Sequence, residues 1–424
     1  MIRSRNDGST PGGSRIGEKV PMVPVGGYGG ADEPPTGSPQ GGAAVIVDVD
    51  THWEIERFAD GADPLAPWAD RIPKGLDRLA FAIAGDLLGD LPDPKPTPAE
   101  LLPGLVKLAE DKGGPVILHP LHQSTSTERV AWMDAIGIDH SLVNPGGYWQ
   151  GLEFLGADRP DGVRRCNDFL ADALSDHADR LHLVAIVDLT DPQVAVAELE
   201  RARARGSRAF FLYAEHGRPP GGRSPGHPMY DVVYEAAVRL GMIAVIHVGN
   251  TGADFAGWAD IGWDQPNSSG TAGLVRLANS QRHLVAQQIL AGLLYGGVFA
   301  RHPQLTVLCA EVRTDWIPGF RAIMERQARS SFATGDWPYE RSAADMFRDQ
   351  LRVTPLLGFG DDVWATLDAM PDLTVFSSDY PHQEGNADPL GILRPWLDEL
   401  DDATRAAFLG TNMADCFART GDPL

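Results

Sequence analysis

Ala43-Ala44-Val45-Ile46-Val47-Asp48-Val49-Asp50-Thr51-His52 is an apolar run that ends in carboxylates and a histidine. A short continuous apolar run predicts a strand buried on both faces, as in a parallel sheet. Alternate side chains of a strand share a face, so Asp50 and His52 are expected to point the same way at its carboxyl end. A carboxylate beside an imidazole is half of a transition-metal site.

Similar apolar runs alternate with helix-like segments along the rest of the chain. The clear runs after the first are Ser141–Val143, Leu181–Val187, Ser207–Leu212, Met242–His247, Leu305–Ala310 and Leu373–Phe376. An eighth, Leu351–Leu357, is weaker. This alternation predicts an α/β fold, and its number of units favours a closed (β/α)8 TIM barrel over a doubly wound sheet. No GxGxxG follows the first run, which argues against a dinucleotide-binding fold.

Three segments do not fit a minimal barrel. Residues 1–43 are rich in Gly, Pro and Ser and predict a disordered tail, because they bury too little apolar surface to offset the entropy of ordering. Residues 55–120 and 249–282 are predicted insertions after the first and fifth strands, where barrels carry substrate-binding loops. Plain surface insertions are the alternative. The predicted organisation is a tail over 1–43 and one barrel over 44–424.

Composition narrows the class of partner. The chain has 424 residues and a net charge of −22, which would repel nucleic acids and anionic membranes. No stretch approaches the roughly 20 apolar residues of a membrane helix. The three cysteines are far apart and lack CxxC spacing, which argues against a disulfide framework or a cysteine zinc site. We therefore expect a cytoplasmic protein with a small-molecule partner and no secretory signal.

Two further strands end in possible metal ligands. His247 ends the fifth run, and Asp379 follows the last run within Ser378-Asp379-Tyr380-Pro381-His382. Barrel enzymes place their catalytic groups at the carboxyl ends of strands. We therefore expect Asp50, His52, His247 and Asp379 to hold one metal ion. A structural histidine and a turn aspartate are the alternatives for the last two.

The order Asp-x-His, later His, later Asp resembles the amidohydrolase superfamily, and in particular its aminocarboxymuconate-semialdehyde-decarboxylase-like branch. The resemblance covers roughly residues 44–420, and the segments that carry it further are Gly297–Leu305, Glu311–Pro318, Ser378–His382 and Gly410–Asn412. It implies that Asp50, His52 and His247 are metal ligands, and that Asp379 is both a ligand and the proton-transfer group. It also implies a possible homodimer.

The chain departs from that pattern at three positions. Asp50 stands where the family more commonly has the first histidine of His-x-His. Glu311 stands after the sixth strand, where many decarboxylases of the branch have a histidine, and this favours hydrolysis over decarboxylation. The fourth strand ends in Phe210-Phe211-Leu212-Tyr213, so no lysine is available to bridge two metals, and a single ion is expected.

The predicted activity is that of a metal-dependent hydrolase. The ion lowers the pKa of water toward about 7, and Asp379 acts as general base, with Glu311 as a second catalytic group. His382, Arg313 and His283 are candidates for substrate binding, with turn, surface or cap roles as the alternative. Zinc is the expected ion, with manganese or iron as alternatives because the ligands are rich in oxygen. A non-oxidative decarboxylase, a hydratase and a barrel that only binds are the other readings of the same site.

Overall fold

The computed structural model describes residues 45–53, 64–72, 125–146, 149–212, 219–248, 280–281, 283–330, 335–356, 361–381 and 388–424. The predicted tail, most of both predicted insertions and His382 lie outside these residues.

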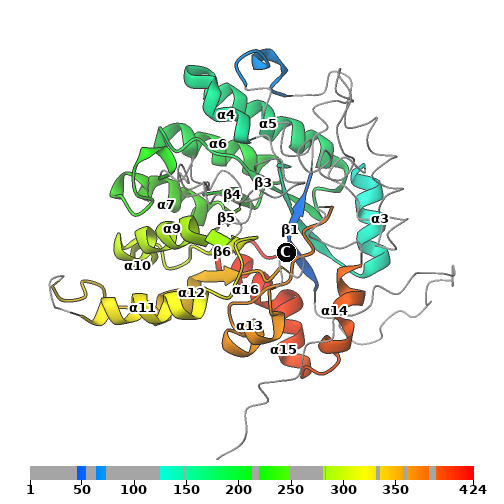
Figure 1. Cartoon of the computed structure of the whole chain (residues 1–424). Coiled ribbons are helices and arrows are strands. Elements are labelled where there is room, and N and C mark those ends of the chain that lie inside the picture. Colours follow the sequence, from blue (N-terminus) through cyan, green and yellow to red (C-terminus); the bar gives the residue numbers. More distant parts are fainter. Residues whose placement is uncertain are drawn as a thin grey trace, which may run out of the picture.

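A parallel sheet forms the centre of the molecule, and each strand is hydrogen-bonded to the next in chain order (Figure 1). Its strands are β1 (Val47–His52), β2 (His140–Asn144), β3 (Leu181–Ala185), β4 (Ala209–Phe211), β5 (Ile243–His247), β6 (Val307–Ala310) and β7 (Leu351–Val353). The register pairs His52 with Asn144 and His247 with Ala310, so the carboxyl ends of these strands lie level. The fold is therefore α/β and resembles a TIM barrel, as the alternation predicts.

A closing segment, residues 373–380, joins the two edge strands. On the β7 side, Val353 N donates to Leu373 O at 2.9 Å. On the β1 side, His52 N donates to Tyr380 O at 2.7 Å. Parallel bridges pair Thr374 with Val353 and Tyr380 with Thr51. The sheet edges are thereby linked into a ring.

The last two predicted strands differ from the expectation. The weaker run at Leu351–Leu357 contains a regular strand, whereas the clearer run at Leu373–Phe376 forms only one isolated bridge, at Thr374. The reason lies in part with Phe376, whose N–H donates to Phe408 O at 3.0 Å. That carbonyl belongs to a short π-helix, η8 (Ala407–Thr411), so a helix replaces part of the strand pairing.

Helices surround the sheet on the outside (Figure 1). They are α3 (Ser126–Ile136), α4 (Trp149–Leu152), α5 (Arg159–Leu174), α6 (Pro192–Ala204), α7 (Asp231–Arg239), α9 (His283–Tyr295), α10 (Val298–Arg301), α11 (Ile317–Arg329), α12 (Ala343–Gln350), α13 (Val363–Ala369), α14 (Pro389–Leu397), α15 (Asp402–Ala406) and α16 (Asn412–Arg419). Within the described ranges, no helix combines the length and the apolar character needed to cross a membrane.

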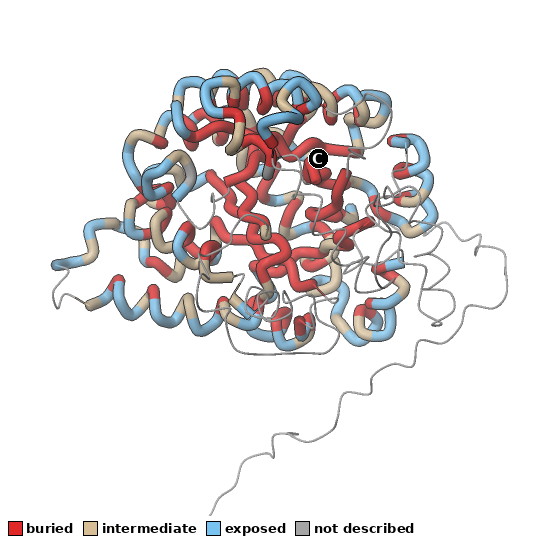
Figure 2. The backbone as a smooth tube through the Cα atoms, turned by 45° about the horizontal axis from the view of Figure 1, so that its top comes forward, coloured by how far each residue is buried: buried red, intermediate tan, exposed pale blue. Residues whose placement is uncertain are grey.

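Alternate strand residues belong to two different apolar cores. Val184, Ala209 and Ile243 share a register and lie in one core, whereas their neighbours Ala185 and Phe210 lie in the other. The second core also contains side chains of α6, α7 and α9. Both faces of the strands are thus buried, as continuous apolar runs predict. Figure 2 shows this buried centre within a more exposed outer layer.

The Gly410-Thr411-Asn412 motif fastens the closing segment to the start of β1. A Cβ on Gly410 would lie 1.7 Å from Val45 O, so only glycine permits this approach. Asn412 Nδ2 donates to Pro371 O at 2.8 Å and to Thr374 O at 3.0 Å. The motif therefore has a structural role, next to the segment that carries Asp379.

Candidate metal centre

Four buried side chains meet at the carboxyl ends of the strands. Asp50 and His52 come from β1, His247 ends β5 and Glu311 follows β6. Each offers one ligand atom, and the four atoms lie within 4.8 Å of one another. The period of a strand explains why Asp50 and His52 share this face. The level register of β5 and β6 brings His247 beside Glu311.

The two imidazoles face the same two carboxylates. His52 Nε2 and His247 Nε2 each lie 3.4 Å from Asp50 Oδ1. Glu311 Oε2 lies 3.1 Å from His247 Nε2 and 3.9 Å from His52 Nε2. Two nitrogen and two oxygen donors in one small volume suit a first-row divalent ion. The residues present therefore fit a single metal.

Hydrogen bonding of His247 directs one ring nitrogen toward this centre. Its Nδ1 donates to Val248 O at 2.7 Å, which leaves Nε2 as the ligand atom. Within the described part of the chain, Asp50 Oδ2 is buried and has no hydrogen-bond partner, and His247 Nε2 is buried against the carboxylates of Asp50 and Glu311. Buried polar atoms normally have partners, and a metal ion satisfies such atoms by coordination.

Electrostatics at the centre favour a cation. Burial by itself lowers the pKa of His247, but Asp50 and Glu311 outweigh it and raise this pKa well above its ordinary value. Burial likewise raises the pKa of Asp50, but His247 and His52 outweigh it and hold this pKa below its ordinary value. Surroundings that hold a proton between two carboxylates also attract a divalent ion.

Asp379 lies against the same group from the closing segment. Its Oδ1 is 3.1 Å from His52 Nε2, and its N–H donates to Asp50 O at 2.9 Å. Asp379 and Glu311 have φ values of 55° and 56°, in the left-handed region that side chains other than glycine rarely adopt. Such conformations concentrate at functional sites. Which of these two carboxylates binds the ion, and which transfers protons, stays a prediction.

The other predicted site residues lie beyond the four-residue cluster. Arg313, two residues after Glu311, has a φ of 63° and pairs with Asp315 at 2.9 Å. His283 begins α9 and stacks on Trp316, with ring centroids 5.7 Å apart. Burial lowers the pKa of His283, Asp315 raises it and Arg313 lowers it further, so these charges act on one another. His382 lies outside the described residues.

Sequence reasoning assigned no role to three residues that contact the candidate ligands or the segment beside them. Asn144, at the end of β2, donates from Nδ2 to Asp50 Oδ1. Asp48 Oδ1 accepts a hydrogen bond from Ser378 N at 2.9 Å. Burial raises the pKa of Asp48 to about 7, although its hydrogen bonds with Ser378 lower this pKa. Arg129 of α3 donates to His52 O at 2.7 Å. Asn144 could have been found, because it is a polar residue that ends an apolar run, but Arg129 has no such signal.

Comparison with solved structures identifies relatives of the same fold. An amidohydrolase from Mycobacterium avium subsp. paratuberculosis K-10 matches with a TM-score of 0.62 and 20% identity, over 88% of this chain and 99% of that one. A 5-carboxyvanillate decarboxylase from Novosphingobium aromaticivorans DSM 12444, solved with manganese and 4-hydroxy-3-methoxy-5-nitrobenzoic acid, matches at 0.57 and 18%, over 88% and 96%. A 2,6-dihydroxybenzoate decarboxylase from Rhizobium matches at 0.53 and 18%, over 89% and 99%.

The sequence comparisons give the family. No curated protein matches the chain. Residues 145–418, which include β3 to β7 and the closing segment, match the amidohydrolase family. The predicted superfamily is confirmed, and the decarboxylases among the similar structures agree with the predicted branch. The chain belongs to the amidohydrolase family.

Proposed function

We propose that this protein is a metal-dependent carboxy-lyase that removes CO2, without oxidation, from a small hydroxylated organic acid. The observation that carries the proposal is the burial of every ionisable group at the centre. Asp379 is 0% exposed and His247, the most exposed of the five, is 8% exposed. The two decarboxylases of similar fold, which act on hydroxylated benzoates, support the same reaction class.

Burial favours loss of CO2 because the charged carboxylate of the substrate leaves as a neutral molecule. A carboxylate held among Asp50, Glu311 and Asp379 is poorly solvated and repelled, whereas CO2 is neutral. Asp50, His52 and His247, with Asp379 or Glu311, would hold a divalent ion, which would supply positive charge to stabilise the anionic substrate.

Asp379 is proposed to move the proton. The bond between carbon and the carboxylate breaks, its electron pair stays on the carbon, and the proton of the Asp379 carboxyl joins that carbon as CO2 leaves. Asp379 then regains a proton from solvent. Glu311 is the alternative donor. Because either carboxyl can supply the proton, a histidine after β6 is not required for this reaction.

Arg313, His283 and His382 are proposed to bind a second anionic group of the substrate. Arg313 already holds the carboxylate of Asp315, and His283 responds to the charge of both. A substrate carboxylate would replace or join Asp315 in this cluster. Zinc is the proposed ion, and manganese is tested beside it because of the oxygen-rich ligands. We also propose a complete (β/α)8 barrel over 44–424.

Hydrolysis is the second candidate, and the position of Asp379 favours it. Its Oδ1 lies 3.1 Å from His52 Nε2, where a general base could accept the proton of an attacking water. A base and a metal on one side of the substrate are the parts that hydrolysis of a C–N or C–O bond requires.

Product analysis separates the two reactions. Full-length protein loaded with Zn²⁺ or Mn²⁺ would be given a panel of hydroxybenzoates and, separately, a panel of esters, amides and lactones in D2O. We expect CO2 in a one-to-one ratio with a product that carries deuterium at the former carboxyl carbon. Turnover of the second panel without CO2 would replace the carboxy-lyase with the hydrolase.

A further inference from the structure

Arg129 is a buried cation directly behind the metal centre. It lies in the first turns of α3 and is 2% exposed. Its Nη2 donates to the backbone oxygen of His52 at 2.7 Å. Within the described residues, its Nε and Nη1 have no hydrogen-bond partner. Burial lowers the pKa of Arg129 to about 10, so it remains charged at neutral pH.

Aromatic rings compensate this buried charge. The guanidinium carbon lies 4.5 Å from the centroid of the Tyr380 ring and 5.7 Å from that of Trp53. A cation at these distances is attracted to the face of an aromatic ring. Trp132, three residues along α3 and so on the same face, stacks on Tyr380 with centroids 4.0 Å apart. Arg129 and Trp132 together hold the Tyr380 ring.

Tyr380 connects this clamp to the metal centre. It directly follows Asp379, and its carbonyl accepts the N–H of His52 at 2.7 Å. The carbonyl of His52 in turn accepts from Arg129. Both backbone polar groups of His52 are therefore bound to members of one cluster, and that cluster also fixes the residue after Asp379.

We propose that Arg129 is a positioning residue, which sets the separation of His52 and Asp379 by clamping Tyr380. The proposal rests on the metal centre described above. It assigns the 3.1 Å contact between His52 Nε2 and Asp379 Oδ1 to a helix that provides no ligand itself. Metal affinity and ligand geometry should then depend on Arg129 separately from its contribution to folding.

The test compares two buried arginines in the full-length protein. Arg129→Lys keeps the charge but cannot both lie over the ring and reach the His52 carbonyl with a planar fork. Arg352→Lys is the matched control, because Arg352 is 7% exposed and its Nη1 donates to Leu351 O at 2.7 Å, at the opposite end of the strands. Mn²⁺ affinity by titration, the Co²⁺ visible absorption spectrum and Tm would be measured for both.

We expect Arg129→Lys to bind Mn²⁺ about 10-fold more weakly and to change the Co²⁺ spectrum, since partners of metal ligands commonly have effects of 10- to 100-fold. Arg352→Lys should lower Tm but leave affinity and spectrum unchanged. Equal lowering of Tm by both, with wild-type metal binding in Arg129→Lys, would overturn the proposal.

A second pair covers the case in which Arg129→Lys fails to fold. Tyr380→Phe keeps the ring and should retain wild-type affinity, whereas Tyr380→Leu removes the ring and should weaken Mn²⁺ binding. Equal affinity of these two variants would also overturn the clamp. If wild-type protein binds neither ion, the proposed metal centre fails, which is a different result from failure of the clamp.

Discussion

The carboxyl ends and the amino ends of the same strands differ in the charged groups that they carry. At the carboxyl ends, three carboxylates crowd around two histidines, and Asp379 and Glu311 take left-handed backbone conformations. At the amino ends, Arg208, Arg352 and Arg419 bind carbonyl oxygens, and Arg208 also pairs with the carboxylate of Asp422.

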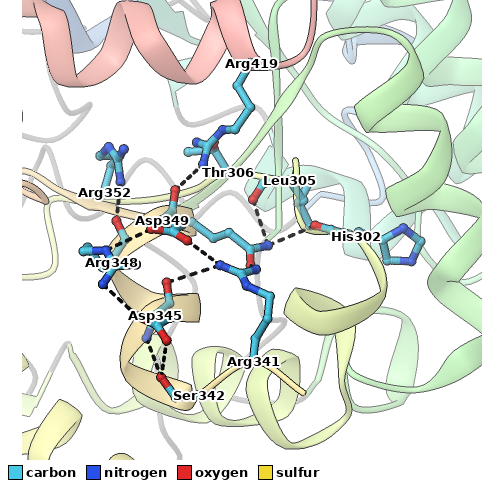
Figure 3. Close-up of polar contacts among 11 residues, drawn as sticks. His302, Leu305, Thr306, Arg341, Ser342, Asp345, Arg348, Asp349, Arg352 and Arg419 are labelled. Atoms are coloured by element: carbon cyan, nitrogen blue, oxygen red, sulfur yellow. Dashed lines mark hydrogen bonds and ion pairs between the residues drawn. The ribbon is translucent and has the colours of Figure 1, made fainter. Parts of the chain in front are cut away.

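Polar side chains form a network of hydrogen bonds and ion pairs at the amino ends of β6 and β7 (Figure 3). Arg419 Nη2 donates to Thr306 Oγ1 at 2.8 Å, just before β6. Gln350 Nε2 donates to Leu305 O at 3.1 Å, and Arg352 Nη1 donates to Leu351 O at 2.7 Å. These side chains bind the backbone where the strands begin. Their chemistry serves the fold, as barrels generally divide stability and catalysis between their two ends.

Replacing a carboxylate at the carboxyl end should have the largest effect. Asp50→Asn removes the charge that both histidines face at 3.4 Å. We expect metal affinity to fall by more than about 100-fold, the upper range for groups that only support a ligand. Metal content after dialysis would measure it. His182→Asn at the amino end is the control, and a loss of metal in that variant would contradict the division of roles.

A smaller effect is expected from the amide that holds Asp50. Asn144→Ala removes the donor to Asp50 Oδ1, and metal affinity should fall by roughly 10- to 100-fold. Asn167→Ala is the matched control, because Asn167 is also a buried asparagine, whose Nδ2 donates to Ile186 O at 2.8 Å. Calorimetric titration should show weaker binding only for Asn144→Ala. Similar affinities in the two variants would remove Asn144 from the site.

This contrast also explains which features the sequence could reveal. Candidate ligands at strand ends were predicted because Asp50, His52 and His247 interrupt or end apolar runs, and the period of a strand assigns them a face. The same rule applies to Asn144. Arg129 does not follow this rule, because its role depends on the packing of its helix against Tyr380, which is far away along the chain.

The sequence likewise predicted the elements of the fold but not the tertiary contacts between them. Continuous apolar runs identified the parallel strands and the helices between them. The closing segment was harder, since the pairing of Phe376 with the π-helix carbonyl of Phe408 is a tertiary contact with no local pattern. The role of Glu311 beside His247 likewise depends on the register of two strands, which the sequence alone does not fix.

A substitution at Gly410, where the π-helix meets the residue two before β1, tests packing without changing a candidate metal ligand. Gly410→Ala places a methyl group 1.7 Å from Val45 O, and we expect a loss of about 3 kcal/mol in the free energy of unfolding. Gly319→Ala in α11 is the matched control, because a Cβ there meets no atom within 4 Å and should stabilise by roughly 0.5–1 kcal/mol. Urea unfolding would measure both. Equal stability of the two variants would show that the close approach of Gly410 to Val45 does not limit how the π-helix packs.

The smallest effect expected is a pH dependence that arises at the amino end. His182 Nε2 lies 3.1 Å from His140 Nδ1, and their rings stack. Burial, Arg208, His140 and Arg203 lower the pKa of His182 to about 3. A histidine with a depressed pKa gains its proton on unfolding, so its contribution to stability is complete above the unfolded pKa of about 6.5 and falls as pH is lowered toward 3.

Between about pH 6.5 and about pH 5 this amounts to about 2 kcal/mol, at 1.36 kcal/mol for each pH unit. Unfolding by urea at about pH 7.5 and about pH 5 would measure the loss, and His182→Asn should reduce it. His227→Asn, at an exposed histidine, should leave it unchanged. Asp48, the second residue of β1, opposes the trend, because its raised pKa makes its own contribution fall as pH rises through about 7. The difference between wild type and His182→Asn removes that term, so a pH dependence identical in the two would show that the histidine pair does not set it.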